Sequence, residues 1–526
     1  MPQLKTRMYF KKALLILLPL ALLCCLLVIF YGGCGHPSES TSYTVADPTG
    51  DWGYPSPYTH YSRGPGYIRM NLIFETLVWK DDSDFVPALA KDWEYVEAEN
   101  AYIFELRDDV KWHDGTDFTA EDVVFTFNYT NQHPYQWVDS SLVESAEAID
   151  EHTVKLYLSQ LYAPFLQNVA GTQPIIPKHI WQNVTEPENF TDAQAVIGTG
   201  PYTLADYSQE HGTYLYKAYS DYYLGRPAMD ELKFVKISEA MIPSALEQGL
   251  VNAGDVPPEI ISELEEAGLT ILTAPYAWNA KLMINHQKEP LSSKQFRQAL
   301  AYAINRTALV EITQMGHALA GSPGMIPPTS SWYNPNTPQY EYDPVRAKQL
   351  LEGLNYTLEN AYFTKGGEEL KLELIAEADF KEVGQFVKGQ LEALGIKIEF
   401  STLEAKTVDA RVEAWDFDLS IYGHGGLYEP SVLHTVIVEE GFNSARYHSN
   451  ETLNQLLEAQ LSEMDAEERK ELVWQIQEIY AEDLPALTLY YPNWYWAHDG
   501  SVPLYYTMDG IASCIPVPLN RMSFVK

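Results

Sequence analysis

The chain has 526 residues, of which 46% are hydrophobic and 13% aromatic, so it can bury a large core, which we expect to form two lobes. Its 72 acidic and 35 basic residues give a formal net charge of −37, which excludes nucleic acid and anionic membrane surfaces as binding partners. Three of the four cysteines lie at or before residue 34, which leaves Cys514 alone and excludes a disulfide framework and a cysteine-based zinc site.

The N-terminus has the pattern of an export signal. Basic residues precede an unbroken apolar run from Ala13 to Phe30, and two glycines then lead directly to Cys34. A cysteine at this point predicts lipid modification of Cys34, which would anchor the mature chain by acyl chains to the outer face of the cell membrane. Residues 1–34 are therefore expected to be the signal segment, and residues 35–42 a polar linker.

Two features of this segment keep two alternatives open. Tyr31 occupies a position where a small aliphatic residue is usual, and the run is longer than the about 7–15 residues of a typical cleaved signal. The alternatives are an uncleaved membrane helix and simple secretion. All three interpretations place residues 35–526 outside the cytoplasm.

Alternating apolar residues predict strands in the first half of the chain. The segments 93–98 and 102–106 alternate in this way, and the polar pair that begins at Glu99 is typical of a hairpin connection. A short helix is expected over 119–130, with Thr119 as its N-cap.

The second half of the chain has helical and strand patterns in alternation. Helical spacing of apolar residues occurs over 296–306 and over 465–480. Residues 371–400 predict a complete strand–helix–strand unit, in which Asp379 would cap the helix and Glu382 would complete a capping box. Such units build parallel sheet with right-handed crossovers, so the expected class is α/β.

Local signatures of catalysis are absent from the sequence. No Gly-rich phosphate loop precedes a Lys-Ser or Lys-Thr pair, and neither a His-Glu-x-x-His nor a Gly-x-Ser-x-Gly motif occurs. The 13 histidines are scattered without metal-ligand spacing. We therefore expect a protein that is not an enzyme and has no cofactor, and a glycosidase-like carboxylate pair is the remaining catalytic alternative.

Six segments spread over the chain share their order with one family of transport proteins. They are IFETLVWKDDSDFVPALAKDW at 73–93, VKWHDGTDFTAEDVVFTF at 110–127, IGTGPYTL at 197–204, FRQALAYAINR at 296–306, DFDLSIYGHGGLYEP at 416–430 and EIYAEDLPALTLYYPNWYWA at 478–497. Together they resemble the extracytoplasmic solute-binding proteins of peptide and nickel ABC importers, called solute-binding family 5. The resemblance covers almost all of the chain after the export segment.

This resemblance implies a two-lobed, periplasmic-binding-protein-like fold of the Venus flytrap type, with a large extra N-terminal subdomain. The first lobe would comprise residues 43–278 and 487–526, and the second lobe residues 279–486. Two crossover segments, near Trp278 and near Leu489, would form the hinge. A solute bound between the lobes would shift the population towards a closed form.

The family also implies a function and partners. The chain would be a monomeric binding protein that captures an oligopeptide, a dipeptide or a similar small polar solute and delivers it to an ABC permease driven by cytoplasmic ATPases. One alternative is a nickel-binding or metal-chelate-binding protein of the same family. An alternative of another class is a surface hydrolase that acts on peptides or glycans.

The ligand branch stays undecided, because this chain departs from both patterns. Peptide-binding relatives carry an aspartate in the loop that matches 423–430, and that aspartate is absent here. The arginine that nickel-binding relatives often carry near the segment matching 163–177 is absent as well.

The same resemblance suggests which side chains meet the solute. The loop at 423–430 faces the cleft in relatives, which makes His424, Tyr428 and Glu429 candidates for ligand binding. Arg63, in an early aromatic-rich loop, would hold a ligand carboxylate with its two-pronged guanidinium group.

Four further residues complete the candidates. Trp278 and Trp494 lie near the expected crossovers, and aromatic side chains commonly line ligand pockets. No metal site is expected, and His434 and His448 are the metal ligands of the alternative interpretation.

Overall fold

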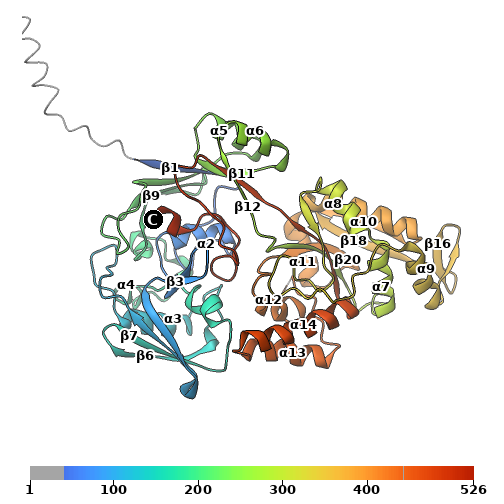
Figure 1. Cartoon of the computed structure of the whole chain (residues 1–526), viewed down its shortest axis with the longest axis horizontal. Helices are drawn as coiled ribbons and strands as arrows, with labels where there is room; N and C mark the ends of the chain where they lie inside the picture. Colours follow the sequence, from blue (N-terminus) through green and yellow to red (C-terminus); the bar gives the residue numbers. More distant parts are fainter. Residues whose placement is uncertain (1–40, 442, 526) are drawn as a thin grey trace, which may run out of the picture.

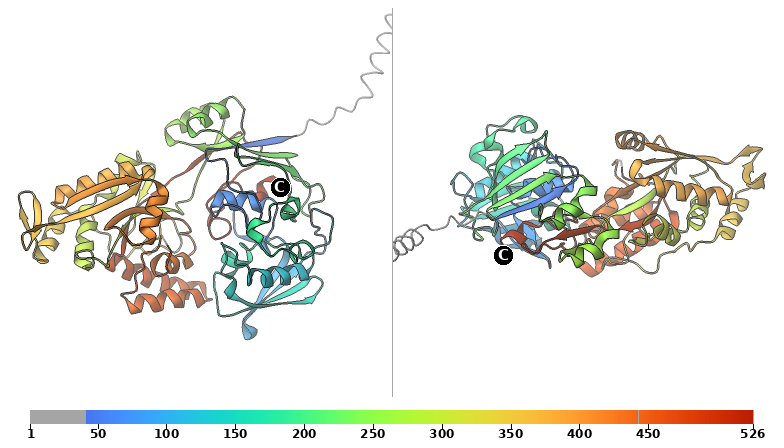
Figure 2. Two further views of the ribbon diagram at one scale, coloured as in Figure 1. Left: turned by 180° about the vertical axis from the view of Figure 1, so that it is seen from behind. Right: turned by 90° about the horizontal axis from the view of Figure 1, so that it is seen from above.

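In the computed structural model, which describes residues 41–441 and 443–525, two lobes lie side by side and are joined by narrow connections (Figures 1 and 2). The expected export segment with Cys34 lies outside the described residues, so its cleavage and lipidation stay predictions. Within these described ranges, no helix has both the length and the hydropathy that a bilayer crossing needs.

The first lobe is built on a seven-stranded mixed sheet. Its strands in order are β12 (Thr270–Thr273), β22 (Tyr495–His498), β11 (Ala253–Val256), β1 (Ser42–Asp47), β10 (Glu231–Lys236), β9 (Thr213–Ala218) and β8 (Tyr202–Ser208). The central strand β1 runs parallel to both β10 and β11, while the outer pairs are antiparallel. The helices of this lobe include α2 (Gly64–Asn71), α4 (Lys178–Trp181), α5 (Ile242–Glu247) and α6 (Ile261–Glu266).

The extra N-terminal subdomain belongs to this lobe. It is a four-stranded antiparallel sheet with the order β4 (Ala90–Val96), β5 (Ala101–Leu106), β7 (Thr153–Leu158) and β6 (Val143–Asp150), next to the short pair β2 (Val78–Lys80) and β3 (Phe85–Pro87). Helix α3 (Ala120–Thr130) packs against β6 and β7. The predicted hairpin and helix are thus confirmed, and the Thr119 N–H donates to the Asp122 carboxylate at 3.0 Å where the helix begins.

The second lobe has its own six-stranded sheet. The order is β14 (Ala318–Ala320), β21 (Ala486–Pro492), β13 (Asn279–Ile284), β20 (Leu419–His424), β18 (Lys371–Glu377) and β19 (Lys397–Leu403). Strands β18 and β19 are parallel and flank helix α10 (Lys381–Leu394), which confirms the predicted strand–helix–strand unit. The expected capping box is wrong, because Asp379 lies inside a short 3-10 turn and Phe380 takes the N-cap position without a side-chain bond.

Helices cover both faces of this second sheet. They are α7 (Lys294–Ala303), α8 (Arg306–Thr313), α9 (Pro344–Gly353), α11 (Ala405–Glu413), α12 (Ser431–Ile437), α13 (Glu451–Ser462) and α14 (Ala466–Asp483), and a small sheet adds β15 (Thr357–Glu359), β16 (Tyr362–Lys365) and β17 (Glu368–Glu369). The single helix expected over 296–306 is wrong at its end, because Ile304 is extended and Asn305 caps α8. The helix expected over 465–480 is confirmed, with Asp465 accepting from two backbone N–H groups.

Two crossings join the lobes. The first runs over residues 274–278, between β12 and β13. Strand β21 pairs with β13 and β14 up to Pro492, and β22 pairs with β11 and β12 of the first lobe. The second crossing is therefore at 493–494, later than the expected boundary, and Leu489 lies inside the second sheet.

The C-terminal segment returns to the first lobe. The Arg521 guanidinium lies 3.9 Å from the ring centroid of Trp79, and the Trp79 indole N–H donates to Asn520 at 3.0 Å. The buried Glu75 carboxylate is 3.4 Å from Arg521 and supplies the opposite charge. These contacts hold the C-terminal segment against the first lobe.

Candidate ligand-binding site

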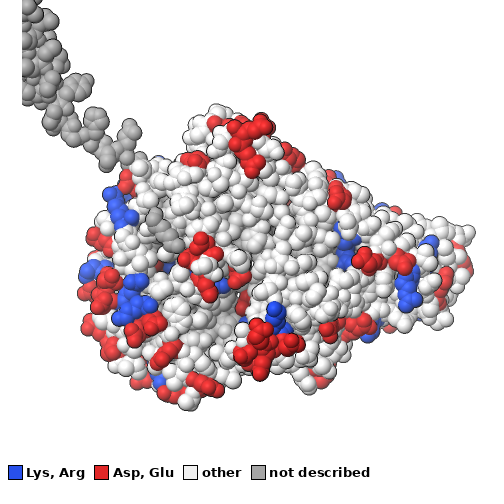
Figure 3. Space-filling view, viewed as in Figure 1, with Lys and Arg blue, Asp and Glu red and all other residues white. Residues whose placement is uncertain are grey.

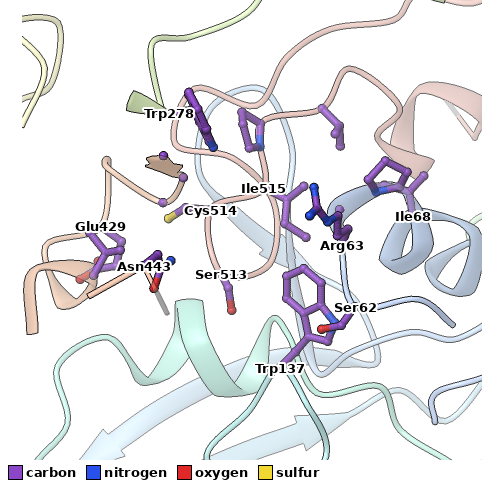
Figure 4. Close-up of a pocket in the computed structure, with 18 of the residues that line it drawn as sticks. Ser62, Arg63, Ile68, Trp137, Trp278, Glu429, Asn443, Ser513, Cys514 and Ile515 are labelled. Atoms are coloured by element: carbon purple, nitrogen blue, oxygen red, sulfur yellow. The ribbon is translucent and has the colours of Figure 1, made fainter. Parts of the chain in front are cut away.

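A cavity of about 1150 Å³ lies between the two lobes. Figure 4 shows Arg63, Ile68 and Trp137 of the first lobe on one side, and Glu429 and Asn443 of the second lobe on the other. Ligand pockets are typically about 300–1,000 Å³, so this cavity has room for a solute larger than one amino acid. Because its walls come from both lobes, a bound solute would contact both.

Aromatic rings form the wall of the cavity beside the two crossings. The ring centroids of Trp278 and Trp494 are 6.0 Å apart, and Phe380 stacks on Trp278 at 6.2 Å with an interplanar angle of 7°. Gly423 makes this packing possible, because a Cβ there would lie 2.0 Å from two ring atoms of Trp278. A glycine on β20 therefore lets the Trp278 ring lie against the strand.

On the first-lobe wall, Asp47 at the end of β1 is fully bonded. Its Oδ1 accepts from the Thr49 N–H at 2.8 Å and from the Gly50 N–H at 3.1 Å. Its Oδ2 accepts from the Trp52 indole at 2.7 Å and from the Arg69 guanidinium at 2.5 Å. Asp47 thus fixes the loop that follows β1 and has no capacity left for a ligand.

The neighbouring carboxylate, Asp255 on β11, differs in this respect. It lines the same cavity, yet no side chain of the described residues donates a hydrogen bond to it or forms an ion pair with it. Burial raises the pKa of Asp255 to about 7, and the charges of Glu239 and Asp47 add to this shift. Trp496 faces Asp255 across the antiparallel pair of β11 and β22.

Charges on the second-lobe wall are paired with one another. The Glu429 carboxylate accepts from Arg469 at 2.5 Å and from the Ser431 N–H at 3.0 Å. The two ring nitrogens of His434 bond to Glu439 and Glu458, each at 2.9 Å. The bond to Glu439 and then that to Glu458 raise the pKa of His434 above its usual value, against an opposing effect of burial.

Hydrogen bonds also join the lobes away from the crossings. The Asn168 side chain donates to the Ser431 hydroxyl at 2.9 Å, and the Ala163 N–H donates to the Leu461 carbonyl at 2.7 Å. In Figure 1, α13 reaches the first lobe below the crossings, where the second bond forms. The cavity is thus bounded by the crossings at one end and by these contacts at the other.

Four of the six predicted ligand-binding residues line the cavity: Arg63, Trp278, Trp494 and Glu429. Two others, His424 and Tyr428, are absent from the described residues that line it. His424 is buried in the second lobe with neither ring nitrogen bonded, and the Tyr428 hydroxyl lies 2.7 Å from that of Thr329. A direct contact of any of these six with a ligand stays a prediction.

The histidines of the metal alternative are not brought together. His434 lines the cavity with both nitrogens bonded to glutamates, while His448 is exposed and does not line it. The described part of the chain has no group of three or more His, Cys, Asp or Glu that could hold a metal ion. Cys514 also lines the cavity, but burial raises the pKa of its thiol, which keeps it protonated and unreactive.

Sequence reasoning missed Asp255 and Trp496, which line the cavity. Neither belongs to a motif. They meet because β11 pairs with β22, although β22 begins at Tyr495, 242 positions after the start of β11 at Ala253. No local signal in the sequence marks such a long-range pairing.

Comparisons with known proteins agree with this architecture. The family model described as bacterial extracellular solute-binding proteins, family 5 (middle part), matches residues 84–432. The oligopeptide-binding protein AppA of Bacillus subtilis is 28% identical over 447 residues, which cover 80% of this chain and 81% of AppA. The nickel-binding periplasmic protein of Escherichia coli is 26% identical over 384 residues, which cover 69% of this chain and 72% of that protein.

A solved structure supports the fold. NikA from Brucella suis, in complex with Fe(III)-EDTA, has a TM-score of 0.79 at 20% identity, over 90% of this chain and 98% of NikA. The predicted two-lobed α/β fold is thereby confirmed. Because the family model spans more than half of its length, the chain belongs to the bacterial extracellular solute-binding proteins of family 5.

Proposed function

We propose that this chain captures a peptide or a similar small polar solute in the cavity between its lobes and delivers it to an ABC permease. The observation that carries the proposal is a cavity of about 1150 Å³ whose walls come from two lobes joined by two crossings. This arrangement couples solute binding to lobe closure, because a solute that contacts the walls of both lobes stabilises the closed form, in which the two walls are close together.

The peptide interpretation is supported by the oligopeptide-binding relative and by the character of the walls. Aromatic rings suit the apolar parts of varied peptides, and Arg63, whose side chain donates to no other described residue, suits a terminal carboxylate. Metal-chelate binding is the second candidate, favoured by the nickel-binding relative. Against it, both nitrogens of His434 are occupied, so this histidine would have to leave two glutamates to bind a metal.

We place the chain outside the cytoplasm, held at the outer membrane face by lipid on Cys34. Its acidic surface, visible on both lobes in Figure 3, suits a monomer that stays dissolved at high concentration. A permease would recognise the closed form, and cytoplasmic ATPases would drive transport. The chain itself would act as a binding protein and not as a catalyst.

A thermal-shift experiment tests this function. Pools of di-, tri- and oligopeptides, nickel chloride and nickel–histidine would be added to the purified chain, because a ligand that binds only the folded state raises the melting temperature. A shift with a peptide pool and none with either nickel probe is expected. A shift with nickel–histidine alone would replace the peptide proposal by the chelate one, and release of cleaved peptides on incubation would replace both by a hydrolase.

A further inference from the structure

We propose that the solute carries an alkylammonium group and that Asp255 of the first lobe binds it. This proposal rests on the proposed function, because it assigns a chemical class to a solute of the same cavity. Beyond the amino terminus that every free peptide carries, a lysine side chain and a diamine present this group, and the experiment below separates these two.

The geometry begins with the register of three neighbouring strands. Val45 on β1 pairs with Ala253 on β11 in parallel, so Asp47 and Asp255, two residues further along each strand, lie side by side. Across the other edge of β11, Asp255 is paired directly with Trp496 on β22. All three residues line the cavity, so Asp255 stands in the middle of a row with a bonded carboxylate on one side and an indole on the other.

The partners of the other cavity carboxylates set Asp255 apart. Asp47 is bonded to Arg69, and Glu429 to Arg469. Glu439 and Glu458 share His434. Burial and then the charges of Asp379 and Asp409 raise the pKa of Glu377, but Arg63 lies near it as an opposing positive charge. Asp139 is exposed, and its carboxylate accepts hydrogen bonds from the N–H and the hydroxyl of Ser141. Asp255 is thus a largely buried cavity carboxylate with no cation from the described part of the chain beside it.

A carboxylate in this setting is costly to ionise without a cation. Its pKa of about 7 expresses that cost, since burial and two neighbouring carboxylates disfavour the charged form. An ammonium group from the solute would supply the missing charge inside the cavity, where the attraction is stronger than in water. The empty protein therefore carries an unfavourable charge that a cationic solute removes.

Aromatic rings complete the surroundings of this carboxylate. Trp496 on β22 faces it, and Trp494 lies in the crossing just before β22. Burial and then the charge of Asp255 raise the pKa of the Tyr506 phenol, so this ring also lies near the carboxylate. The faces of indole and phenol rings attract cations, and the effect grows when water is excluded. A site with one carboxylate and several ring faces favours an organic ammonium over a hydrated metal ion, which prefers several oxygen ligands.

The experiment compares solutes that differ in one charge. Isothermal titration calorimetry of the full chain at about pH 8 would use the tripeptides Ala-Lys-Ala, Ala-Met-Ala and Ala-Glu-Ala, together with 1,5-diaminopentane. We expect Ala-Lys-Ala to bind at least about tenfold more tightly than Ala-Met-Ala, which is the affinity ratio that one hydrogen bond between charged groups gives. In Asp255→Asn this ratio should fall below about twofold, and the diamine should lose its binding.

A matched control removes the same charge outside the cavity. Glu239 is exposed and acts electrostatically on Asp255 but does not line the cavity, so Glu239→Gln should keep the tenfold ratio. Asp255→Ser repeats the test with a different side chain, and melting curves of each variant show that it is folded.

Each outcome decides the proposal. Equal affinity of the wild type for the lysine and methionine peptides overturns it, and so does a lysine preference that survives in both Asp255 variants. In these cases the proposed function still stands, because a peptide binds. Binding of the diamine to the wild type and not to Asp255→Asn supports the cation site even if no tripeptide binds. Failure of every probe overturns the cation site, whereas the proposed function is decided separately by the thermal-shift screen with peptide pools.

Discussion

The side-chain amide of Asn168 in the first lobe donates a hydrogen bond of 2.9 Å to the hydroxyl of Ser431 in the second lobe. The same amide donates to the Tyr162 hydroxyl at 2.9 Å within its own lobe. Ser431 in turn lies at the start of α12, beside the bonded pair of Glu429 and Arg469. Asn168 is therefore a polar link that exists only while the lobes are together.

Asn168→Ala should weaken solute binding without lowering the free energy of unfolding of either lobe. The lost bond belongs to the closed arrangement, so its absence should cost about 0.5–1.5 kcal/mol of binding, or roughly a factor of 2–10 in Kd. Small-angle scattering should also show a larger radius of gyration for the ligand-free variant. Tyr162→Phe is the control, because it removes only the bond within the lobe, and equal effects of both variants would contradict the link.

Asp255→Asn should stabilise the empty protein at alkaline pH. The folded pKa of about 7 lies above the usual 3.8, so the folded state binds more protons and loses stability as the pH rises between these values. Above about pH 7 the wild type carries the whole penalty and the amide carries none, which predicts a gain of about 1–4 kcal/mol for the variant. Near pH 4 the two proteins should be equally stable.

Urea unfolding at about pH 4 and pH 8 measures this difference directly. The groups that face Asp255 are the carboxylates of Asp47 on β1 and of Glu239, the indole of Trp496 on β22 and the phenol of Tyr506. A variant that is less stable than the wild type at pH 8 would show that Asp255 already has a favourable partner in the empty protein.

Replacing the glycine beneath Trp278 should damage the cavity wall. In Gly423→Ala the new methyl would lie 2.0 Å from the indole ring, so the ring must move, at a cost of about 1–3 kcal/mol of stability. Gly425→Ala is a close control, because there the nearest atom of Trp278 is 3.4 Å away, an ordinary contact distance. Thermal melting and ligand titration of both variants should show a loss of stability and affinity in the first and little change in the second.

The sequence predicted those elements whose signals are local. Alternation and helical spacing over 371–400 were sufficient for β18, α10 and β19, and Asp465 marked the start of α14. The same reasoning failed at Ile304. The helical spacing of apolar residues continues across this position, but the helix ends before it and Asn305 begins a new helix.

The candidate site was harder to predict, because its residues are brought together by strand pairing. Arg63, Trp278 and Trp494 were placed from the family resemblance, and they do line the cavity. Side chains on a strand alternate between the two faces of its sheet, so His424 lies on the opposite face of β20 from Gly423, the residue against which Trp278 packs. The position of Asp255 depends on its register with β1 and β22, which no short segment of sequence contains.

The last prediction concerns the pairing of His434 with two glutamates. Because these bonds raise the folded pKa above 6.5, the protonated ring contributes stability that is fully present below pH 6.5 and is lost as the pH rises through the folded value. The His434 side chain is 17% exposed, but the partners Glu439 and Glu458 are 48% and 71% exposed, so solvent screening limits the contribution to about 0.5–1 kcal/mol. His434→Gln should therefore be less stable than the wild type near pH 6 by this amount, and the difference should shrink by pH 9.

His448→Gln, at an exposed histidine that does not line the cavity, controls for the loss of a histidine as such. Urea unfolding at both pH values would decide the matter, and a deficit of His434→Gln that stays constant with pH would show that the ring acts by packing and not by its charge.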